Sequence, residues 1–410
     1  MFMQICNNNE CTACKVCSNI CPTKSITFEK DDLDVLSYSV NKLTCINCNL
    51  CIKVCPVISA KKSHPIKAYI GWSLNKKTQY NAASGGIASE LYAYFVNKGY
   101  YVIGAAWNSS SEVKLVGCEV EEKITDFRNS KYTYSDPENI YMLAYDKIKM
   151  GKKVLFIGLP CQVAAMKNYL YLKKCLDSSV LVDIICHGSA PNQYLKSHII
   201  KICGSKKKIS KIYFRDPMKG THNYYFTLVD YDDNIVYSKN VNQTDCYQIG
   251  YHKCLIYREN CYRCKFTTHQ RCGDLTLSDV SGLGTLAPVD FMCNNQMSSV
   301  LCNTDKGEKV LQKLTDMNKI ILHERPIYEE LNHEKYCNHP PVPHPNRESF
   351  KHIYIQTRDF DRAANNALRK ELIVNHFIQI IHYDEIKKLI MRYMPYKAKK
   401  LIKKIIRGLN

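Results

Sequence analysis

The sequence has 410 residues, of which 45% are hydrophobic and 22 are cysteines, and its formal net charge is +19. This length exceeds one small domain and fits a short module followed by a larger one. The N-terminus lacks the basic start and apolar run of a secretory signal, and no stretch of 18 uninterrupted apolar residues occurs, so we expect a cytoplasmic protein without a membrane span. In a reducing compartment, this many cysteines indicate metal ligation and argue against disulfides.

The first sixty residues contain the same cysteine spacing twice, C-x₂-C-x₂-C-x₃-C-P, with a repeat distance of 34 residues. The eight cysteines are Cys11, Cys14, Cys17, Cys21, Cys45, Cys48, Cys51 and Cys55. This is the spacing of bacterial ferredoxins that hold two 4Fe–4S clusters, in which the fourth cysteine of each run binds the other cluster. Cys55 is therefore expected to complete the first cluster and Cys21 the second. A disulfide knot or a zinc site is the alternative, which the ordered repeat disfavours.

After a linker of residues 57–67, the pattern indicates the beginning of an α/β domain. Residues 67–72 and 101–107 are typical of strands, and between them a segment with apolar residues at helical spacing begins after Ser84-Gly85-Gly86. A helix start presents unpaired backbone N–H groups, and glycine lets a ligand come close, so this turn can bind a phosphate. The alternative is a tight turn that binds no ligand, and the pattern by itself favours this alternative.

Two cysteines follow two predicted parallel strands that are apolar throughout. Residues 153–157 precede Cys161 and a helix that continues to residue 172, and residues 180–185 precede Cys186. In an open α/β sheet, ligands bind at the carboxyl ends of the strands. Both cysteines are therefore expected at the ligand-binding edge of the sheet.

A further pair, Cys261-x₂-Cys264, follows a stretch of antiparallel strands at residues 211–240. A lone pair needs two more ligands, which Cys161 and Cys186 are placed to supply, so we expect a third 4Fe–4S cluster. Cys272 is the alternative ligand and zinc the alternative metal; iron–sulfur is favoured because the first sixty residues already imply electron transfer. The remaining cysteines follow no pattern and are interpreted as structural: Cys6, Cys118, Cys175, Cys203, Cys246, Cys254, Cys293, Cys302 and Cys337.

The C-terminal quarter begins with what the pattern predicts to be a final strand at residues 296–304, and a helix opens at Lys306-Gly307. A proline- and histidine-rich loop at residues 338–345 and helices from residue 358 follow. Residues 386–410 carry nine Lys or Arg and no acid, on an amphipathic pattern that fits a membrane surface or an acidic protein. The alternative is a helix packed on its own domain. Nucleic acid is not an expected partner.

Several of these motifs together resemble the coenzyme F(420) hydrogenase/dehydrogenase beta subunit family. The resemblance extends from about residue 66 to about residue 335. It rests on Ser84–Gly86, Ser130–Tyr132, Leu155–Gln162, Asp183–Gly188, Phe214–Asp216 and Cys261–Cys264. It implies a domain that binds FAD and a 4Fe–4S cluster and exchanges hydride with a deazaflavin or another acceptor. A two-cluster N-terminal module is a common addition in the family.

The resemblance also implies roles for individual residues. FAD phosphates or ring edges are expected at Ser84, Gly85, Gly86, Ser130 and Lys131. His187 and Arg215 are expected beside the isoalloxazine or the substrate, and a supporting role next to the Cys186 ligand is equally compatible with His187. The chain departs from the family at Leu159, where threonine is usual, and at residues 278–282, where Gly-Asp-Phe-Trp-Gly is usual, so the family's substrate is not carried over.

We therefore predict an α/β protein with three parts: a two-cluster ferredoxin domain at residues 1–60, a flavin and iron–sulfur domain at 66–335, and a loop with a basic helical tail at 336–410. The predicted function is an FAD-dependent iron–sulfur oxidoreductase that acts on a deazaflavin or an unidentified organic substrate. A non-catalytic electron-transfer adaptor is the alternative. The expected partner is a ferredoxin or other redox protein, and the expected location is the cytoplasm or the inner face of the membrane.

Overall fold

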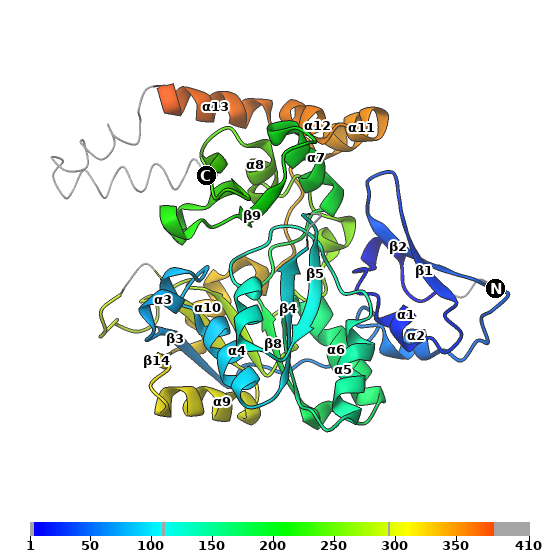
Figure 1. Ribbon diagram of the computed structural model, residues 1–410, viewed down its shortest axis with the longest axis vertical. Coiled ribbons are helices and arrows are strands. Elements are labelled where there is room, and N and C mark those ends of the chain that lie inside the picture. The colour runs from blue at the N-terminus through cyan, green and yellow to red at the C-terminus, as the bar shows by residue number, and fades with distance from the viewer. Residues whose placement is uncertain (1–3, 109–110, 294–295, 381–410) are drawn as a thin grey trace.

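The computed structural model describes residues 4–108, 111–293 and 296–380, and within them the main feature is a nine-stranded mixed sheet of order β14-β3-β13-β12-β8-β7-β4-β5-β6 (Figure 1). Its strands are β3 (Lys67–Ser73), β4 (Tyr101–Trp107), β5 (Val113–Cys118), β6 (Ser135–Asp136), β7 (Val154–Gly158), β8 (Ser179–Ile184), β12 (Leu275–Asp279), β13 (Ser298–Cys302) and β14 (Ile320–Arg325). The central strands β4, β7, β8 and β12 are parallel, whereas β13, β3 and β14 add antiparallel pairs. This confirms the predicted α/β class.

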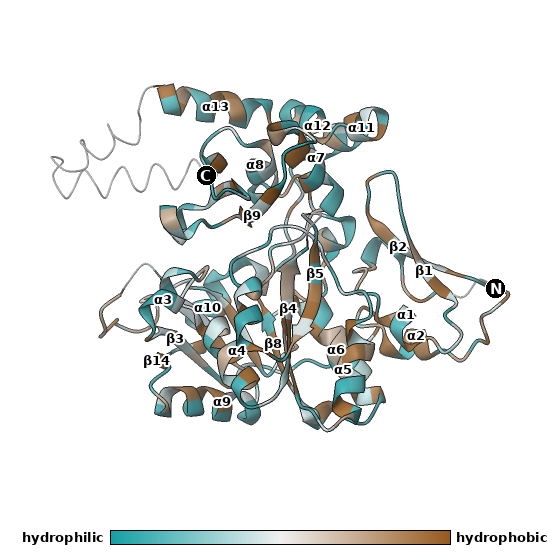
Figure 2. Ribbon diagram, viewed as in Figure 1, coloured by the Kyte–Doolittle hydropathy of each residue, from teal (hydrophilic) through white to brown (hydrophobic). Residues whose placement is uncertain are grey.

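Helices cover both faces of this sheet, and the side chains of β7 alternate between the two cores. Leu155 and Ile157 pack toward α4 (Ile87–Asn97) and α9 (Asp305–Asp316). Val154 and Phe156 pack toward α5 (Ile140–Lys149) and α6 (Pro160–Leu172). Each such side chain contributes about 1.5–3 kcal/mol when fully buried. In the hydropathy colouring of Figure 2, β4 is pale to brown and much of β5 is brown.

The N-terminal module lies beside α5 and α6 (Figure 1) and contains α1 (Val16–Ile20), α2 (Leu50–Val54) and the hairpin of β1 (Ile26–Lys30) and β2 (Leu36–Val40). Its sequence repeat is also a backbone repeat. Lys15 and Asn49, which precede the two helices, are left-handed with φ of 59° and 61°. Val16, Ile20 and Val54 join the core formed by α5 and α6, so the module is packed against the larger part of the chain.

A second unit lies above the carboxyl ends of the parallel strands (Figure 1). It contains the antiparallel sheet of β9 (Ile209–Tyr213), β10 (Tyr225–Asp230) and β11 (Ile235–Asn240), as the sequence predicted. Its helices are α7 (Asn192–Cys203), α8 (Cys246–His252), α11 (Arg347–Thr357), α12 (Phe360–Ala367) and α13 (Arg369–Ile380). Their shared core is rich in aromatic side chains, including Phe214, Phe226, Tyr247 and Phe360.

The structure corrects the sequence prediction at two places. The strand predicted at residues 296–304 is present as β13 (Ser298–Cys302), but it is not the final one, because β14 follows and pairs antiparallel with β3 at the sheet edge. Only three apolar residues begin β14, and its middle is partly exposed, so its pattern is weak. The expected helix from residue 358 is preceded by the unpredicted α11 and begins at Phe360, because Arg358 is left-handed with φ of 53°.

The remaining described segments connect these units. Two of them are short helices: α3 (Lys76–Tyr80) follows β3, and α10 (Ile327–His333) follows β14. Residues 338–345 form neither helix nor strand, as predicted. The predicted basic helix at residues 386–410 lies outside the described residues, and the division at residues 60, 66 and 335 stays a prediction. Among the described helices, none combines the length and apolar character that a membrane crossing requires.

Candidate redox centres

The structure brings together the cysteines that the repeat assigned to each cluster of the N-terminal module. Cys21, Cys45, Cys48 and Cys51 line one pocket. In the other set, burial together with the thiols of Cys14, Cys11 and Cys55 raises the pKa of Cys17, which places these four groups around one another. Cys21 of the first run therefore lies with the first three cysteines of the second run, and Cys55 of the second run lies with the first three of the first run.

Cys6 is a fifth thiol at the inner set and follows no sequence pattern. It is 5% exposed, and its side chain lies within hydrogen-bond reach of Cys11 and Cys55. The Tyr38 hydroxyl fixes this segment, since it donates to the Cys6 carbonyl at 2.6 Å and accepts from the Ile5 N–H at 3.0 Å. The segment around Cys6 thus packs against the inner cysteine set.

The two cysteine sets differ in their access to solvent. The inner thiols Cys11, Cys14, Cys17 and Cys55 are 6–9% exposed. In the outer set, Cys48 is exposed and Cys21 and Cys45 are partly exposed. The loop that carries Cys45 and Cys48 also presents Leu43, 97% exposed, and Ile46, 63% exposed. The outer set therefore faces solvent through an apolar rim.

A third set of thiols lies at the carboxyl ends of the parallel strands. Cys161 follows β7 and begins α6, Cys186 follows β8, and Cys261 and Cys264 come from the loop before β12; all four line one pocket. Strands β7 and β8 are neighbours and parallel, with Gly158 opposite Asp183, so their ends carry the two cysteines to the same edge. Burial and the thiols of Cys261 and Cys264 raise the pKa of Cys186 to about 12.

The lining of this pocket suits a polar, negatively charged group such as a cluster. Two buried donors in its wall, the Ser189 hydroxyl and Arg258 Nε, have no hydrogen-bond partner among the described residues. The Arg258 guanidinium is 3% exposed. Cluster sulfides accept hydrogen bonds and thiolates carry negative charge, so the residues present fit a 4Fe–4S group.

Cys272, the alternative ligand, takes a different place. Its backbone N–H donates to Asp183 Oδ2 at 2.7 Å, and Asp183 also accepts from Arg271 Nη2 at 3.1 Å. The charged groups that affect the Cys272 thiol are Asp183, Arg271, Lys62 and Lys167, and Cys272 does not line the four-thiol pocket. This geometry favours Cys161 and Cys186 as partners of Cys261 and Cys264.

Arg215, one of the two expected catalytic residues, is held by Asp279. Its Nη1 lies 2.9 and 2.7 Å from the two carboxylate oxygens, and its Nε donates to the Thr221 carbonyl at 2.9 Å. The guanidinium also stacks over Tyr224, 4.7 Å from the ring centroid. Asp279 is the aspartate of the Gly-Asp-Phe-Trp-Gly pattern, and the departures at Ser278, Val280 and Ser281 flank it, so they lie beside the partner of Arg215.

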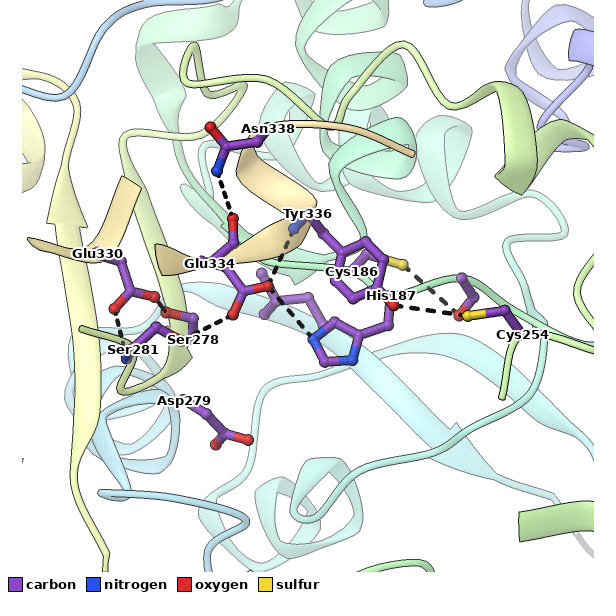
Figure 3. A network of polar contacts seen from close by, with 12 residues as sticks. Cys186, His187, Cys254, Ser278, Asp279, Ser281, Glu330, Glu334, Tyr336 and Asn338 are labelled. Carbon is purple, nitrogen blue, oxygen red and sulfur yellow. Dashed lines mark hydrogen bonds and ion pairs between the residues drawn. The ribbon is translucent and has the colours of Figure 1, made fainter. Parts of the chain in front are cut away.

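His187, the other expected catalytic residue, projects from the end of β8 toward the same region (Figure 3). Its side chain is 46% exposed, Nε2 lies 3.9 Å from Glu334 Oε1, and its ring lies 4.4 Å from the ring of Tyr336. The charges that affect it include Asp279 and Arg215. His187 is thus the neighbour in sequence of a third-set thiol and faces the Arg215–Asp279 pair.

His252, at the end of α8, belongs to this region although no sequence pattern indicated it. Its Nε2 is buried without a hydrogen-bond partner among the described residues, and burial, with a contribution from His187, lowers the pKa of His252 to about 4. Tyr132 and Tyr224 contact its ring edge-on at 5.5 and 5.2 Å. In the sequence, His252 stands alone and belongs to no motif, so it could not be told from an ordinary core residue.

Lys131 and Arg128 form a cationic segment beside Arg215. Lys131 Nζ donates to the Arg128 carbonyl at 2.9 Å, and Asn129 Nδ2 donates to the Arg215 carbonyl at 2.7 Å. Burial lowers the pKa of Lys131 to about 7, and Arg128 Nε is buried without a partner among the described residues. Ser130 sits between them and its N–H is occupied by Asn129 Oδ1. These cations suit an anionic ligand such as a phosphate.

The Ser84–Gly86 turn is largely engaged within the protein. The Gly85 N–H donates to Ser298 Oγ at 2.9 Å, Ser84 Oγ lies 2.9 Å from the same hydroxyl, and a Cβ on Gly85 would meet the Gly71 carbonyl at 2.5 Å. Gly85 is therefore required by packing against β3 and β13. Gly86, left-handed with φ of 86°, begins α4, and any phosphate contact would come from this helix start.

Hydrogen bonds nevertheless connect this turn with the Arg215 region. Gln296, two residues before Ser298, donates from Nε2 to Thr221 Oγ1 at 3.2 Å, and Thr221 accepts from Arg215. Asn129 connects Arg215 with Lys131, because its side-chain Nδ2 donates to the Arg215 carbonyl and its own carbonyl accepts from Lys131 Nζ. Arg215 is thus linked to Lys131 through Asn129, and to the stretch before Ser298 through Thr221 and Gln296.

Two adjacent glutamates of α10 hold the segment around Asp279, and Figure 3 shows one of them, Glu330, with Ser278 and Ser281. Glu330 accepts from Ser278 Oγ at 2.6 Å and from the Ser281 N–H at 3.0 Å, and burial raises its pKa to about 7. Glu329 accepts from Arg325 and from the N–H groups of residues 284, 286 and 287, and this lowers its pKa to about 2. Neighbouring carboxyls of one helix therefore differ in protonation near neutral pH.

Comparison with known proteins confirms the resemblance found in the sequence. Residues 151–326 match the family that is described as the C terminus of the beta subunit of coenzyme F(420) hydrogenase/dehydrogenase, and residues 10–58 match the 4Fe-4S dicluster domain. The xenon-derivatised F(420)-reducing nickel–iron hydrogenase complex from Methanosarcina barkeri is similar at 18% identity and a TM-score of 0.43, over 74% of this chain and 91% of that chain. None of the curated proteins matches the sequence.

Proposed function

We propose that this chain is an FAD-dependent oxidoreductase. The premise is that residues 151–326 of this iron–sulfur protein belong to the coenzyme F(420) hydrogenase/dehydrogenase beta subunit family. Electrons would pass between three 4Fe–4S clusters and FAD, and hydride would pass to or from a deazaflavin or another organic substrate. The observation that carries this proposal is the pocket lined by Cys161, Cys186, Cys261 and Cys264, whose wall also includes Thr12 of the N-terminal module.

The order of the three thiol sets supports a linear electron-transfer chain. Thr12 lies between Cys11 and Cys14 of the inner set, and its carbonyl accepts from Arg258 Nη1 at 2.9 Å. The Cys14 thiol is also among the groups that raise the pKa of Cys161 of the third set. The inner set therefore lies between the solvent-facing outer set and the third set, which continues through Cys186 to His187.

The outer set is where a redox partner would dock. Three of its four cysteines, Cys21, Cys45 and Cys48, are exposed or partly exposed, and Leu43 and Ile46 provide an apolar rim. Electron transfer complexes are often small and transient, so two exposed apolar side chains beside a cluster are sufficient for a brief encounter. We assign this face to a ferredoxin or another small redox protein.

FAD, when bound, converts between the one-electron steps of the clusters and two-electron hydride transfer. In this chain, Lys131 and Arg128 would hold its phosphates, because their cations have no carboxylate hydrogen-bonded to them among the described residues. Arg215, fixed by Asp279, would orient the ring or the substrate. His187 and His252 would be the groups that move a proton there, and the low pKa of His252, about 4, leaves it neutral near pH 7.

The test is quantitation of iron, sulfide and flavin in the full chain after anaerobic purification. We expect about twelve irons for three clusters, with one FAD per chain. The Cys261→Ser variant should lose about four irons, and the matched Cys272→Ala variant should keep them all. Eight irons and no flavin in the wild type, or the same iron loss in both variants, would contradict the proposal.

A non-catalytic electron-transfer adaptor is the second candidate, and one observation favours it. The Gly85 N–H and the Ser84 hydroxyl both bond to Ser298, so part of the expected phosphate-binding turn is already occupied. An adaptor would contain the clusters but bind no FAD, even after incubation with an excess of the cofactor. Flavin binding thus separates the two candidates. A cytoplasmic location, with the tail at the membrane surface, stays part of the proposal.

A further inference from the structure

A cluster of metal-ligating side chains lies in the second unit, away from the three thiol sets. His198 of α7, Cys246 of α8 and Asp361 of α12 place one ligand atom each within 4.8 Å of one another. His198 and Cys246 are each 3% exposed, and Asp361 is 9% exposed. Cys246 was among the cysteines interpreted as structural, since its partners are 48 residues before it and 115 residues after it.

The distances between the three donors fit one cation. His198 Nδ1 lies 2.7 Å from Asp361 Oδ1 and 3.8 Å from Cys246 Sγ, and the sulfur lies 3.5 Å from the same carboxylate oxygen. A triangle with these sides has a point roughly 2 Å from all three corners, close to Zn–N and Zn–O bond lengths and slightly short of a Zn–S bond. A small outward movement of the thiol is sufficient to accommodate zinc.

The second nitrogen of His198 is fixed as in many zinc sites. Nε2 lies 3.0 Å from Asp245 Oδ2, which also accepts from the Tyr237 hydroxyl at 2.8 Å, while Asp245 Oδ1 accepts from the Gln248 N–H at 2.6 Å. A carboxylate behind a histidine holds the proton on the far nitrogen and leaves the near nitrogen to bind the metal. Asp245 would therefore direct the lone pair of Nδ1 at the cation.

The surroundings enclose the three donors and leave one position open. The rings of Phe226, Tyr247 and Phe360 lie within 6.1 Å of the imidazole, so the donors are enclosed by apolar groups. The Asp361 side chain keeps 13% exposure, which leaves room for a water as the fourth ligand. Because the donors come from three helices, a bound cation would fasten α12 to α7 and α8.

The competing explanation is a protonated imidazole between two carboxylates. Asp245 and Asp361 both lie within hydrogen-bond distance of His198, and such an ion pair needs no third donor. The ion-pair explanation gives no role to Cys246, although the sulfur of Cys246 lies on the Asp361 side of the imidazole ring. The thiol is thus the group that distinguishes the two explanations.

We propose that His198, Cys246 and Asp361 bind one Zn²⁺, with Asp245 as the positioning carboxylate, in addition to the iron of the clusters. The full chain, purified anaerobically, is incubated with an equimolar amount of Zn²⁺, desalted, and analysed for zinc and iron. We expect about one zinc per chain and an unchanged iron content. Zinc K-edge X-ray absorption on the same sample should show one sulfur at about 2.3 Å and nitrogen or oxygen neighbours at about 2.0–2.2 Å.

Variants test the assignment. Cys246→Ala and Asp361→Asn should each reduce retained zinc at least tenfold, while Cys118→Ala, which removes another buried thiol, should retain it. Should Cys246→Ala misfold, the absorption spectrum of the wild type still decides, because a zinc with four sulfur neighbours would belong to the cysteine sets and overturn the proposal. Less than about a tenth of a zinc per wild-type chain would also overturn it and leave the imidazolium pair.

Discussion

Arg258 Nη1 donates to the Thr12 carbonyl at 2.9 Å, across 246 positions of sequence. Thr12 lies between two cysteines of the inner set, and Arg258 precedes the Cys261–Cys264 pair. The same guanidinium stacks over Tyr134, 4.6 Å from the ring centroid, and the Tyr134 hydroxyl donates to the Ala13 carbonyl at 2.6 Å. One buried cation thus joins the N-terminal module to the third pocket and faces the thiols of both.

Replacing Arg258 should change the reduction potentials of the inner and third clusters. A buried positive charge favours the reduced, more negative cluster, so Arg258→Leu should lower both potentials, on the order of 50 mV for a unit charge at an effective dielectric of about 20. Redox titration followed by electron paramagnetic resonance measures this shift. Arg263→Leu removes an exposed charge from the same loop and should leave the potentials within about 10 mV. Equal shifts in the two variants would contradict the assignment of Arg258.

The pKa of Lys131, about 7, predicts a pH dependence of FAD affinity. An anionic phosphate binds the protonated ammonium, so affinity should be constant below pH 7 and fall as pH rises above it, by up to tenfold per pH unit. Binding of FAD to the deflavinated chain, measured by fluorescence between pH 6 and 9, gives this profile. Lys131→Met should bind weakly at every pH, and Lys123→Met, at an exposed site, should keep the wild-type profile. A flat wild-type profile would exclude Lys131 from the phosphate site.

The raised pKa of Glu330, about 7, predicts that its carboxyl favours the fold at low pH. The folded state binds the proton more tightly than the unfolded state, so this stabilisation is complete below pH 4.5 and disappears as pH rises through 7. Glu330→Gln should therefore be more stable than the wild type at pH 8, by about 3 kcal/mol, and similar to it at pH 5. Thermal unfolding at the two pH values measures the difference. An effect of equal size at both would show that Glu330 does not titrate in this range.

The adjacent Glu329 should behave in the opposite way. Its pKa, about 2, is lowered by Arg325 and by backbone N–H groups, so the charged carboxylate stabilises the fold at every pH above about 4.5, and this contribution is lost as pH falls through 2. Glu329→Gln leaves Arg325 with its charge unpaired and should cost about 3 kcal/mol at both pH 5 and pH 8. The same unfolding measurement provides the check, and a variant as stable as the wild type would contradict the ion pair.

Charges placed on the apolar rim of the outer set should slow electron transfer from a partner. Leu43→Glu with Ile46→Glu should reduce the rate of reduction by a ferredoxin at least tenfold, because the contact face becomes charged and hydrated. Stopped-flow absorbance of the clusters measures this rate. Ile58→Glu, at a residue of the same module that is 53% exposed, is the matched control. An unchanged rate in the double variant, with full iron content, would place the docking face elsewhere.

The sequence by itself determined the parts whose signals are local. The doubled cysteine run predicts both thiol sets because cluster ligands lie two or three residues apart, and the left-handed residues Lys15 and Asn49 repeat with them. The apolar strands β7 and β8 were recognisable for a similar reason, since burial on both faces makes every residue hydrophobic. Cys161 and Cys186 could then be placed at one edge of the sheet.

Only the tertiary structure decided which distant groups meet. Cys272 and Cys264 look equivalent in sequence, but Cys272 is drawn to Asp183 through its N–H, whereas Cys264 faces the pocket. Ser84-Gly85-Gly86 has the form of a phosphate turn, but Ser298 occupies its donors from 213 and 214 residues away. His198, Cys246 and Asp361 carry no common spacing. Local patterns record which backbone a segment prefers, while ligand sets and ion pairs depend on how helices and strands pack, which no short stretch of sequence encodes.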